Sequence, residues 1–276
     1  MNVVRRGATT ISGQIVLLAI TLISLGPLAF MAATSLRTTS DYALNPAGLP
    51  GALTWDNYIA ALTDLPTLRW ALNSFLVSAT SVAVSTAIAT LAAFAITFGR
   101  FRGRSVLLGG SIGFIMVPPV VLLLPMFVFM VNVKLVNNLA SVTIFYSCLL
   151  VPFAIFFLVT FFRTIPAELL EAAVVDGAGP LRSLVSVVLP LSRAALLTVA
   201  TVNLIWAWNE LLISLVFLQD ENQRTLMAGL SLLQGRYTTN QPLLLAAAML
   251  SVIPVALFYL FSQRSFVKGL TAGIGK

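Results

Sequence analysis

Six long apolar stretches constrain the fold of this chain more than any other feature of its sequence. They cover residues 14–34, 70–98, 106–131, 139–162, 194–218 and 243–261. A helix needs about 20 predominantly apolar residues to cross a bilayer, so each stretch is a candidate span. Hydrophobic residues make up 59% of the 276 residues and charged residues only 9%, more apolar surface than a soluble domain of this size could bury. We predict an all-α integral membrane protein with six transmembrane helices and one domain, 1–276, in the lipid bilayer.

The first apolar stretch follows Arg5 and Arg6, a pattern that a cleaved signal peptide also shows. Its apolar part is longer than the central region of a signal peptide, and Pro27 lies where such a region would be ending. We therefore expect an uncleaved first span.

The basic residues predict the orientation, because cytoplasmic loops carry an excess of Lys and Arg. Of the 16 Lys and Arg residues, 11 lie at the two termini and in the second and fourth loops, and 16 − 11 = 5 lie in the other loops. Both termini are therefore predicted to be cytoplasmic. The external segments are then 35–69, 132–138 and 219–242.

Two residue counts and one missing motif limit the reactions and ligands that this chain can support. The chain has no histidine and one cysteine, Cys148, so it can form neither an internal disulfide nor a histidine-based metal site or general base. It has no G-x-x-x-x-G-K-[ST] motif, so we expect no nucleotide site. The net charge of +7 is spread over short loops rather than one face, which disfavours a nucleic-acid partner. We expect no enzyme activity, metal or cofactor in this chain.

The third apolar stretch contains Pro118, Pro119 and Pro125. Proline lacks a backbone donor and disturbs the preceding turn, so this span is predicted to be kinked or locally unwound. Irregular backbone at membrane depth is tolerated only inside protein or beside a wet cavity. We therefore place the third span toward the interior of the bundle.

The fourth loop, about 163–193, contains a short helical pattern. Pro166 suits the first turn of a helix, and Glu168 and Glu171 complement its positive N-terminal end. Gly177 is a natural stop, because glycine readily adopts the left-handed conformation that ends many helices. A short acidic helix is predicted in the middle of a loop whose other charges are basic.

This predicted helix, over 166–176, has two candidate partners, lipid headgroups and another protein. Membrane-surface helices are typically rich in Lys and Arg on their polar face, whereas this one is acidic. The small Ala172 and Ala173 also suit close insertion into a protein groove. The physical argument favours a protein and leaves lipid open. A second helical stretch, 181–190, leads back to the membrane.

Three motifs in this loop resemble the signature of a known family. Glu171-Ala172-Ala173, Asp176-Gly177-Ala178 and Leu189-Pro190-Leu191 are similar to the EAA motif of ABC-importer permeases. The chain most resembles the six-helix smaller permease subunit of the carbohydrate-uptake, maltose-type branch. Further matching segments are 53–58, 72–74, 100–103, 117–125, 208–210, 225–226 and 263–273. Pro180 and Ala194 depart from the family pattern, and these departures could alter the angle at which the chain leaves the loop.

The resemblance implies a type I ABC-importer permease fold in the bacterial cytoplasmic (inner) membrane, with the short helix acting as a coupling helix. The ATPase-coupling residues would be Glu168, Glu171, Ala172, Ala173, Asp176 and Gly177. The implied partners are a cytoplasmic ATPase dimer that binds ATP and Mg, a second and different permease subunit, and an external solute-binding protein. The segment 219–242 is the surface we expect to meet the binding protein.

Glu210 is the clear case of an ionisable residue inside a predicted span, which by default suggests a functional site. With its polar and aromatic neighbours it could line a substrate path, because a sugar needs paired hydrogen bonds and an apolar stacking face. The candidate path residues are Asn73, Asn203, Trp206, Trp208, Asn209 and Glu210, with Ser74, Tyr146 and Ser147 as weaker candidates. Two alternatives stay open: a structural hydrogen-bond cluster between helices, and an interfacial tryptophan belt.

The sequence therefore predicts a permease subunit that carries a sugar or related polyhydroxylated solute, driven by ATP hydrolysis in a separate subunit. One alternative is an ABC permease for another solute, such as a glycerophosphodiester, phosphate or an amino acid. An ion-coupled secondary transporter is a second, although it leaves the acidic internal helix unexplained. An intramembrane enzyme is a third, and for it the chain lacks a paired catalytic set.

Overall fold

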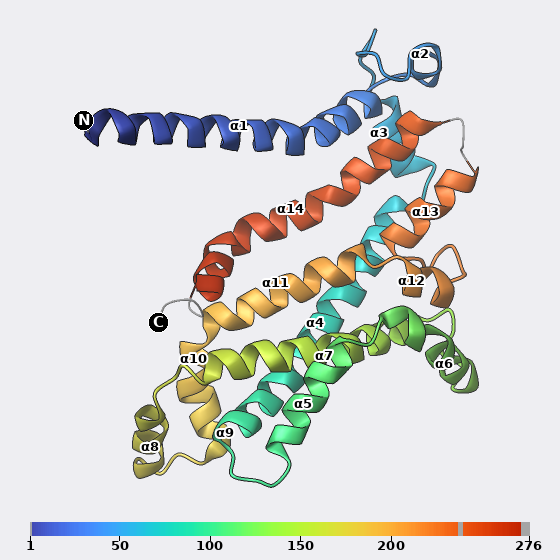
Figure 1. The fold of residues 1–276 in the computed structure, drawn as a ribbon. Helices are drawn as coiled ribbons and strands as arrows, with labels where there is room; N and C mark the ends of the chain where they lie inside the picture. The colour runs from blue at the N-terminus through green and yellow to red at the C-terminus, as the bar shows by residue number, and fades with distance from the viewer. Residues whose placement is uncertain (1, 237–239, 272–276) are drawn as a thin grey trace. The chain divides into compact units, whose positions relative to one another are not determined.

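A computed structural model of the chain describes the backbone of residues 2–236 and 240–271, and the side chains of residues 13–233, 240–260 and 263 (Figure 1). Within these ranges every regular element is a helix, as predicted. The elements are α1 (Asn2–Ser35), α2 (Thr39–Leu44), α3 (Asp56–Thr63), α4 (Thr67–Phe98), α5 (Arg104–Ile115), α6 (Pro119–Asn132), α7 (Leu139–Phe162), α8 (Ala167–Val175), α9 (Pro180–Ser183), the π-helical turn η1 (Leu184–Val188), α10 (Leu189–Leu191), α11 (Arg193–Asn209), α12 (Leu212–Phe217), α13 (Leu226–Arg236) and α14 (Gln241–Thr271). Several of the basic residues counted for the predicted orientation have side chains outside the described residues: Arg5, Arg6, Arg236, Arg264, Lys268 and Lys276.

In the described part of the chain, four helices are individually long and apolar enough to cross a membrane. They are α1 over Gly13–Ser35, α4, α7, and α14 over Gln241–Leu260. Two bent pairs add to them: α5 with α6, and the segment Pro180–Leu191 with α11. Counting each bent pair as one span gives six, the number that the apolar stretches predict.

The predicted irregularity of the third span is confirmed. The helix α5 ends at Ile115, α6 begins at Pro119, and the two are bent by 99°. Pro118 between them is extended, with φ −61° and ψ 130°, the conformation that a residue preceding a proline favours. Pro125 lies within α6 and does not end it.

The prediction of one uninterrupted helix over 194–218 is wrong. The helix α11 ends at Asn209, Glu210 is extended with φ −69° and ψ 126°, and the short helix α12 begins at Leu212. No proline or glycine lies at this break, so the sequence carries no local signal for it. The break is instead supported by hydrogen bonds of the Glu210 side chain, described below.

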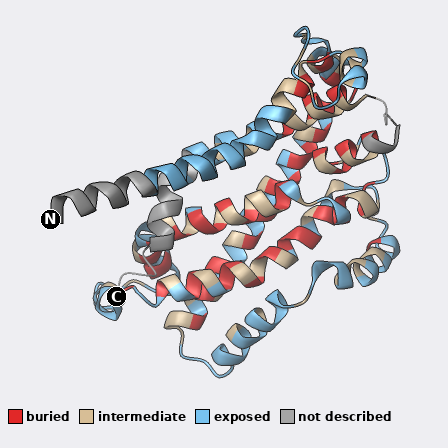
Figure 2. Ribbon diagram, turned by 45° about the horizontal axis from the view of Figure 1, so that its top comes forward, coloured by how far each residue is buried: buried red, intermediate tan, exposed pale blue. Residues whose placement is uncertain are grey.

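The contacts within the chain divide it into two compact units, called here unit 1 (Met1–Thr67 and Leu232–Val252) and unit 2 (Leu68–Ser231 and Ile253–Lys276). In unit 1, α1 is exposed from Gly13 to Phe30 (Figure 2). An apolar helix with no buried face within the chain is one that lipid or another subunit must cover.

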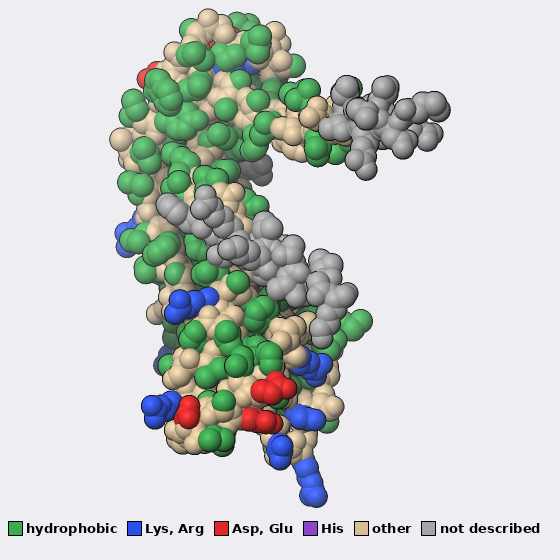
Figure 3. All heavy atoms as spheres, turned by 90° about the vertical axis from the view of Figure 1, so that its left-hand side faces the viewer, with side chains coloured by type: hydrophobic (Ala, Val, Ile, Leu, Met, Phe, Trp, Pro, Cys, Tyr) green, Lys and Arg blue, Asp and Glu red, His purple; other side chains and the backbone are tan. Residues whose placement is uncertain are grey.

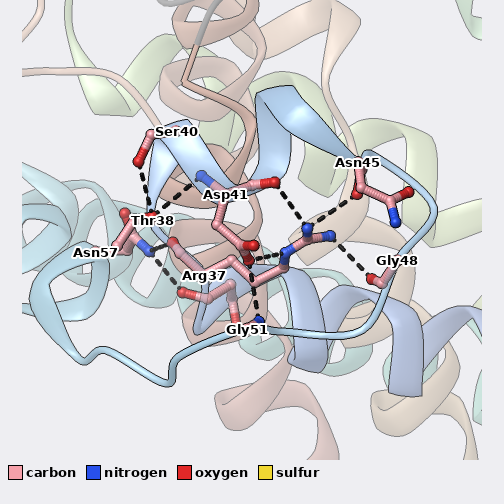
Figure 4. Close-up of polar contacts among 9 residues, drawn as sticks. Arg37, Thr38, Ser40, Asp41, Asn45, Gly48, Gly51 and Asn57 are labelled. Atoms are coloured by element: carbon pink, nitrogen blue, oxygen red, sulfur yellow. Dashed lines mark hydrogen bonds and ion pairs between the residues drawn. The ribbon is translucent and has the colours of Figure 1, made fainter.

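A buried arginine organises the segment that follows α1 in unit 1. Arg37 is 1% exposed, and its guanidinium donates to Asp41 Oδ2 at 2.6 Å and to the carbonyls of Asp41, Asn45 and Gly48 at 2.9 Å each (Figure 4). The Arg37 guanidinium beside Asp41 holds the pKa of that carboxyl below its usual range. One side chain thus closes the turn that spans residues 37–48.

Asn57 and Thr39 tie the same segment to its neighbours in unit 1. The Asn57 amide donates to the carbonyls of Ser35 and Arg37, at 2.8 and 2.7 Å. Thr39 Oγ1 donates to Asn240 Oδ1 at 3.1 Å, just before α14 begins. The predicted external segment 35–69 is therefore an ordered structure with its own polar core.

The helix α7 is the centre of unit 2. Twelve of its 24 residues are buried, and it contributes to both hydrophobic clusters of the unit. One cluster joins α4, α7, η1 and α11 through Ala93, Leu158, Leu184 and Val199. The other joins α4, α6, α7, α11 and α12 through residues that include Met130, Tyr146 and Phe217.

The segment 219–225 of unit 2 is held by polar side chains of α4. Trp70 Nε1 donates to the Glu221 carbonyl at 2.8 Å, and the Asn73 amide donates to the carbonyls of Asn222 and Arg224 at 2.9 Å each. Ser74 Oγ accepts from the Leu226 N–H at 2.8 Å. The start of α13 is therefore fixed against α4.

Close packing between α4 and α13 predicts a matched pair of glycine substitutions. A Cβ at Gly229 would clash with the Trp70 ring, whereas a Cβ at Gly109 in α5 would meet nothing within 4 Å. Gly229→Ala should destabilise the chain by about 1–3 kcal/mol through overpacking. Gly109→Ala should be neutral or stabilising by up to about 1 kcal/mol, because alanine favours helix.

The measurement is the thermal unfolding midpoint of each purified variant in the same detergent. Equal midpoints for Gly229→Ala and Gly109→Ala would contradict the described packing of Trp70 on α13.

Candidate functional site

The predicted short helix in the fourth loop is present as α8, with nine residues. Pro166 precedes it with φ −58° and ψ 133°, and Glu168 lies in its first turn. Proline at this position removes no helical hydrogen bond, and an acidic residue there faces the positive end of the helix dipole. The local sequence therefore accounts for where α8 begins.

The end of α8 is a Schellman motif centred on Gly177. The Gly177 N–H donates to the Val174 carbonyl and the Ala178 N–H to the Ala173 carbonyl, both at 2.9 Å. Gly177 has φ +77°, in the left-handed region that disfavours any residue with a Cβ. The predicted stop is confirmed, with backbone conformation as its reason.

The surface of α8 mixes acidic and apolar side chains, and none of its residues is buried. Glu168 and Glu171 are exposed, and so are Val174 at 64% and Val175 at 86%. In Figure 3 most of the charged side chains in view gather at the end of unit 2 that carries α8. Exposed apolar side chains among these charges are typical of a surface that another protein covers.

A helical hinge joins α8 to the core of unit 2. After α9 the chain passes through the π-helical turn η1, in which the Leu189 N–H donates to the Leu184 carbonyl. Pro190 follows in α10, and the segment Pro180–Leu191 meets α11 at 79°. π-Helical turns are rare and occur mostly as local irregularities. Leu184 and Val188 of this turn are buried in the cluster around α7, so the segment that follows α8 is packed into the core.

A cavity of about 1080 Å³ lies beside α8 within unit 2. Its apolar lining includes Phe94 and Phe98 of α4 and Leu170 of α8, and its charged lining includes Arg100 and Glu171. Phe98 also stacks on Phe162 of α7, with ring centroids 6.4 Å apart. The predicted coupling residue Glu171 therefore lines a cavity that reaches the end of the long helix α4.

The Glu210 side chain closes the break between α11 and α12. Its carboxyl oxygens accept from the Ile213 N–H at 2.9 and 3.1 Å and from the Ser214 N–H at 3.3 Å. The Tyr146 hydroxyl donates to Glu210 Oε2 at 2.5 Å and lies 2.7 Å from Ser214 Oγ. This geometry is that of the structural hydrogen-bond cluster between helices.

A second cavity, of about 340 Å³, lies where α5 and α6 bend. It is lined by Val117 and Pro119 at that bend, by Leu150 of α7, and by Asn203 and Trp206 of α11. Asn203 is 1% exposed, and its Nδ2 has no hydrogen-bond partner in the described part of the chain. Trp206 packs edge-on against Tyr146, with ring centroids 5.4 Å apart.

The structure separates the predicted substrate-path residues into three groups. Asn203 and Trp206 line the cavity at the bend, whereas Glu210 supports the helix break. Asn73 holds the 219–225 segment, and Ser74 does the same. Trp208 is buried, and Asn209 is exposed with its amide donating to the Ile205 carbonyl at 2.7 Å.

Three structurally important residues escaped the sequence analysis. Ser214 completes the Tyr146–Glu210 cluster, and its position four residues after Glu210 is the only sequence signal for it. Asn137 adopts φ +60° and accepts through Oδ1 from the N–H groups of Gln219 and Asp220. In the sequence, Trp70 was recognised only as the first residue of an apolar stretch. Their partners are distant in sequence, so periodicity could not reveal them.

Membrane-length helices with one short exposed helix hinged to their core define a helical membrane permease that works with partner subunits. The chain belongs to the family of binding-protein-dependent transport system inner membrane components, whose sequence profile matches residues 85–272. It has the fold of a bacterial ABC transporter involved in the import of the acidic polysaccharide alginate, with a TM-score of 0.77 and 24% identity over 94% of this chain and 96% of that one.

Similar sequences occur in named transport systems. The chain is 34% identical to the sulfoquinovosyl glycerol transport system permease protein of Agrobacterium fabrum, over 90% of this chain and 87% of that protein. It is 32% identical to a diacetylchitobiose uptake system permease protein of Streptomyces coelicolor, over 91% of each chain.

The Glu210 cluster predicts a stability difference between neighbouring substitutions. Glu210→Ala would leave the N–H groups of Ile213 and Ser214 and the Tyr146 hydroxyl without their acceptor, a loss of about 2 kcal/mol or more for a charged hydrogen-bonding group. Glu210→Gln keeps one acceptor oxygen and should cost less. Asn209→Ala, at an exposed side chain bonded only to its own helix, is the control and should change stability little.

Thermal unfolding in detergent without any solute measures these effects. Should Glu210→Ala unfold at the same temperature as Asn209→Ala, the supporting role of the carboxyl group would be ruled out.

Proposed function

We propose that this chain is the permease subunit through which an ABC importer carries a sugar or a related polyhydroxylated solute across the bacterial cytoplasmic membrane. Both units would belong to one membrane domain, with both chain termini in the cytoplasm, as the distribution of Lys and Arg predicts. ATP would be bound, with Mg, and hydrolysed by a separate ATPase dimer. The observation that carries the proposal is the exposed helix α8, which is terminated by the turn at Gly177 and is joined to the core through η1.

The exposed face of α8 supports docking of a cytoplasmic ATPase. Its acidic residues Glu168 and Glu171 offer charge to a basic partner, and the exposed Val174 and Val175 offer apolar area. A rigid helix end is needed if a push on α8 is to reach the membrane helices, and the Schellman motif at Gly177 supplies it. The buried Leu184 and Val188 would pass the displacement to α4, α7 and α11.

The exposed surfaces also fit two further partners. The helix α1 has no buried residue in its most apolar window, which leaves a large face for lipid and a second, different permease subunit. At the predicted external end, the segment 219–225 is held rigidly by α4 while Asp220 and Glu221 are exposed. A fixed, polar surface of this kind suits transient docking of an external solute-binding protein.

The cavity at the bend of the third span supports the substrate class. Asn203 Nδ2, which is buried and has no hydrogen-bond partner among the described residues, offers hydrogen bonds, and Trp206 offers an apolar ring. Polyhydroxylated solutes need both, because their hydroxyl groups must be hydrogen-bonded once they leave water. The named substrates of the two relatives, sulfoquinovosyl glycerol and diacetylchitobiose, are sugar derivatives.

Substitutions at two glycines of the loop distinguish a loss of coupling to the ATPase from general damage to the loop. Gly177 has φ +77° and Gly179 has φ −69°, and a Cβ at either would meet nothing within 4 Å. Gly177→Val should strain the Schellman motif by about 1–2 kcal/mol or more, and reduce both ATPase co-purification and solute uptake. Gly179→Val should leave both close to wild type, because its conformation accepts a side chain.

Co-purification of an ATPase with the tagged chain, and uptake in a deletion strain carrying each variant, provide the two measurements. The coupling proposal fails if Gly177→Val retains wild-type levels of both while inserting normally in the membrane.

The substrate cavity gives a separate prediction. Asn203→Leu keeps the branched shape of the side chain but removes its amide, and should reduce uptake by about tenfold or more, the effect of one lost polar contact to a buried ligand. Thr198→Val, on the same helix, is the control, because its hydroxyl already donates to the Ala194 carbonyl. ATPase co-purification should remain unchanged in both variants.

Uptake of labelled sugars, glycerophosphodiesters and amino acids in a strain lacking the chain identifies the solute class. Loss of amino-acid uptake with intact sugar uptake would overturn the sugar assignment while leaving the permease role in place.

A further inference from the structure

A small polar pocket lies at the end of unit 2 where α4 and α7 end and α5 begins. Its volume is about 240 Å³, and it does not coincide with the cavity at the bend of the third span. It is lined by Ile96, Thr97, Arg104, Ser105, Leu108 and Arg163. Neither the proposed coupling contacts nor the proposed substrate path accounts for these polar groups.

The charges that face this pocket are all positive. Arg104 is the first residue of α5 and Arg163 follows the last residue of α7. No Asp or Glu lines the pocket, and among the described residues neither arginine takes part in an ion pair. Two guanidinium groups that line one small pocket repel each other, so an anion in the pocket would be favoured.

The N-terminus of α5 and a buried hydroxyl group also favour an anion in this pocket. The helix α5 has 12 residues, no acidic residue in its first turn, and Gly103 at its N-cap without a capping side chain. Its free N–H groups and positive dipole end favour an anion. Thr97 Oγ1 is buried and lacks a hydrogen-bond partner in the described part of the chain. A group with several acceptor oxygens would satisfy the hydroxyl, the N–H groups and the guanidinium groups together.

The surroundings of the pocket identify the source of that anion. The pocket lies at the ends of membrane-length helices, on the side predicted to be cytoplasmic. From it, α5 runs into the membrane region with Val106, Leu107 and Ile112 exposed. A phospholipid would place its phosphate among the arginines and its acyl chains along this apolar face, and basic pockets between helices on the cytoplasmic side suit such headgroups.

We propose that the pocket of Arg104 and Arg163 binds a phosphate group, supplied by the headgroup of an anionic phospholipid. Arg104 and Thr97 also line the cavity beside α8, so the bound lipid would lie next to the coupling loop. The choice of lipid over free phosphate rests on the proposed orientation and membrane role. The test measures lipid retention rather than transport, so a failure of the lipid-site proposal is distinguishable from a failure of the proposed permease function.

The experiment is native mass spectrometry of the full chain, purified from membranes with the subunits that accompany it. Phosphatidylglycerol or phosphatidylcholine is added at increasing concentration, and the retained lipid molecules are counted. The pocket variant is Arg104→Gln with Arg163→Gln. The control is Arg182→Gln with Arg193→Gln, which removes two charges from the same side but lines neither this pocket nor the cavity beside α8.

Wild type and the control should retain phosphatidylglycerol in preference to phosphatidylcholine. The pocket variant should bind phosphatidylglycerol roughly 30-fold more weakly, from the contribution of two basic residues near a membrane surface. Thr97→Val, which leaves the net charge unchanged, should weaken binding roughly fivefold by removing one hydrogen bond.

Two results would overturn the proposal. Equal loss of lipid in the pocket variant and in the control would show a general charge effect, with no site at this pocket. The second result is that excess inorganic phosphate displaces the retained lipid and itself binds to wild type but not to the pocket variant. This would identify free phosphate as the occupant and reject the lipid assignment.

Discussion

A peptide group in the interior of a bilayer meets no water, so its N–H and C=O must be hydrogen-bonded within the protein. This constraint makes the apolar stretches helical, and it requires that the backbone groups freed where a helix is interrupted find other hydrogen-bond partners, which side chains can supply. The carboxyl group of Glu210 binds the N–H groups that begin α12. The Asn73 amide binds two carbonyls of the segment 219–225. Polar residues within apolar helices here stabilise the irregular parts of the fold.

The same constraint bears on how α8 is connected to the helices of unit 2. Intact helices are stiff, so displacement is concentrated where the hydrogen-bond pattern is weakened. In unit 2 such places are the π-helical turn η1 and the 79° bend before α11. Because η1 is packed against α4 and α7, the segment that follows α8 is anchored in the core of unit 2. The bent third span provides a further weak place, next to the cavity that contains Asn203 and Trp206.

Some of the site could be predicted from sequence because its signals are local. Pro166, Glu168 and Gly177 fix the two ends of α8 through helix capping and backbone conformation, and consecutive prolines break the third span. The break at Glu210 could not be predicted, because it depends on a tyrosine 64 positions away in the chain. The six substrate-path residues looked alike as polar or aromatic residues in apolar stretches, and only their partners separate those that support backbone from those that line a cavity.

The sequence by itself determined that the chain is a helical membrane protein with six spans and a capped acidic helix in its fourth loop. It could do so because hydrophobic length, charge placement and capping are properties of neighbouring residues. Only the tertiary structure decided which polar groups are hydrogen-bonded and which, like Asn203 Nδ2, have no partner in the described part of the chain. It also decided that Arg104 and Arg163 line one pocket. Hydrogen-bond partners and electrostatic neighbours come from different helices, and their distances are set by packing that no local pattern encodes.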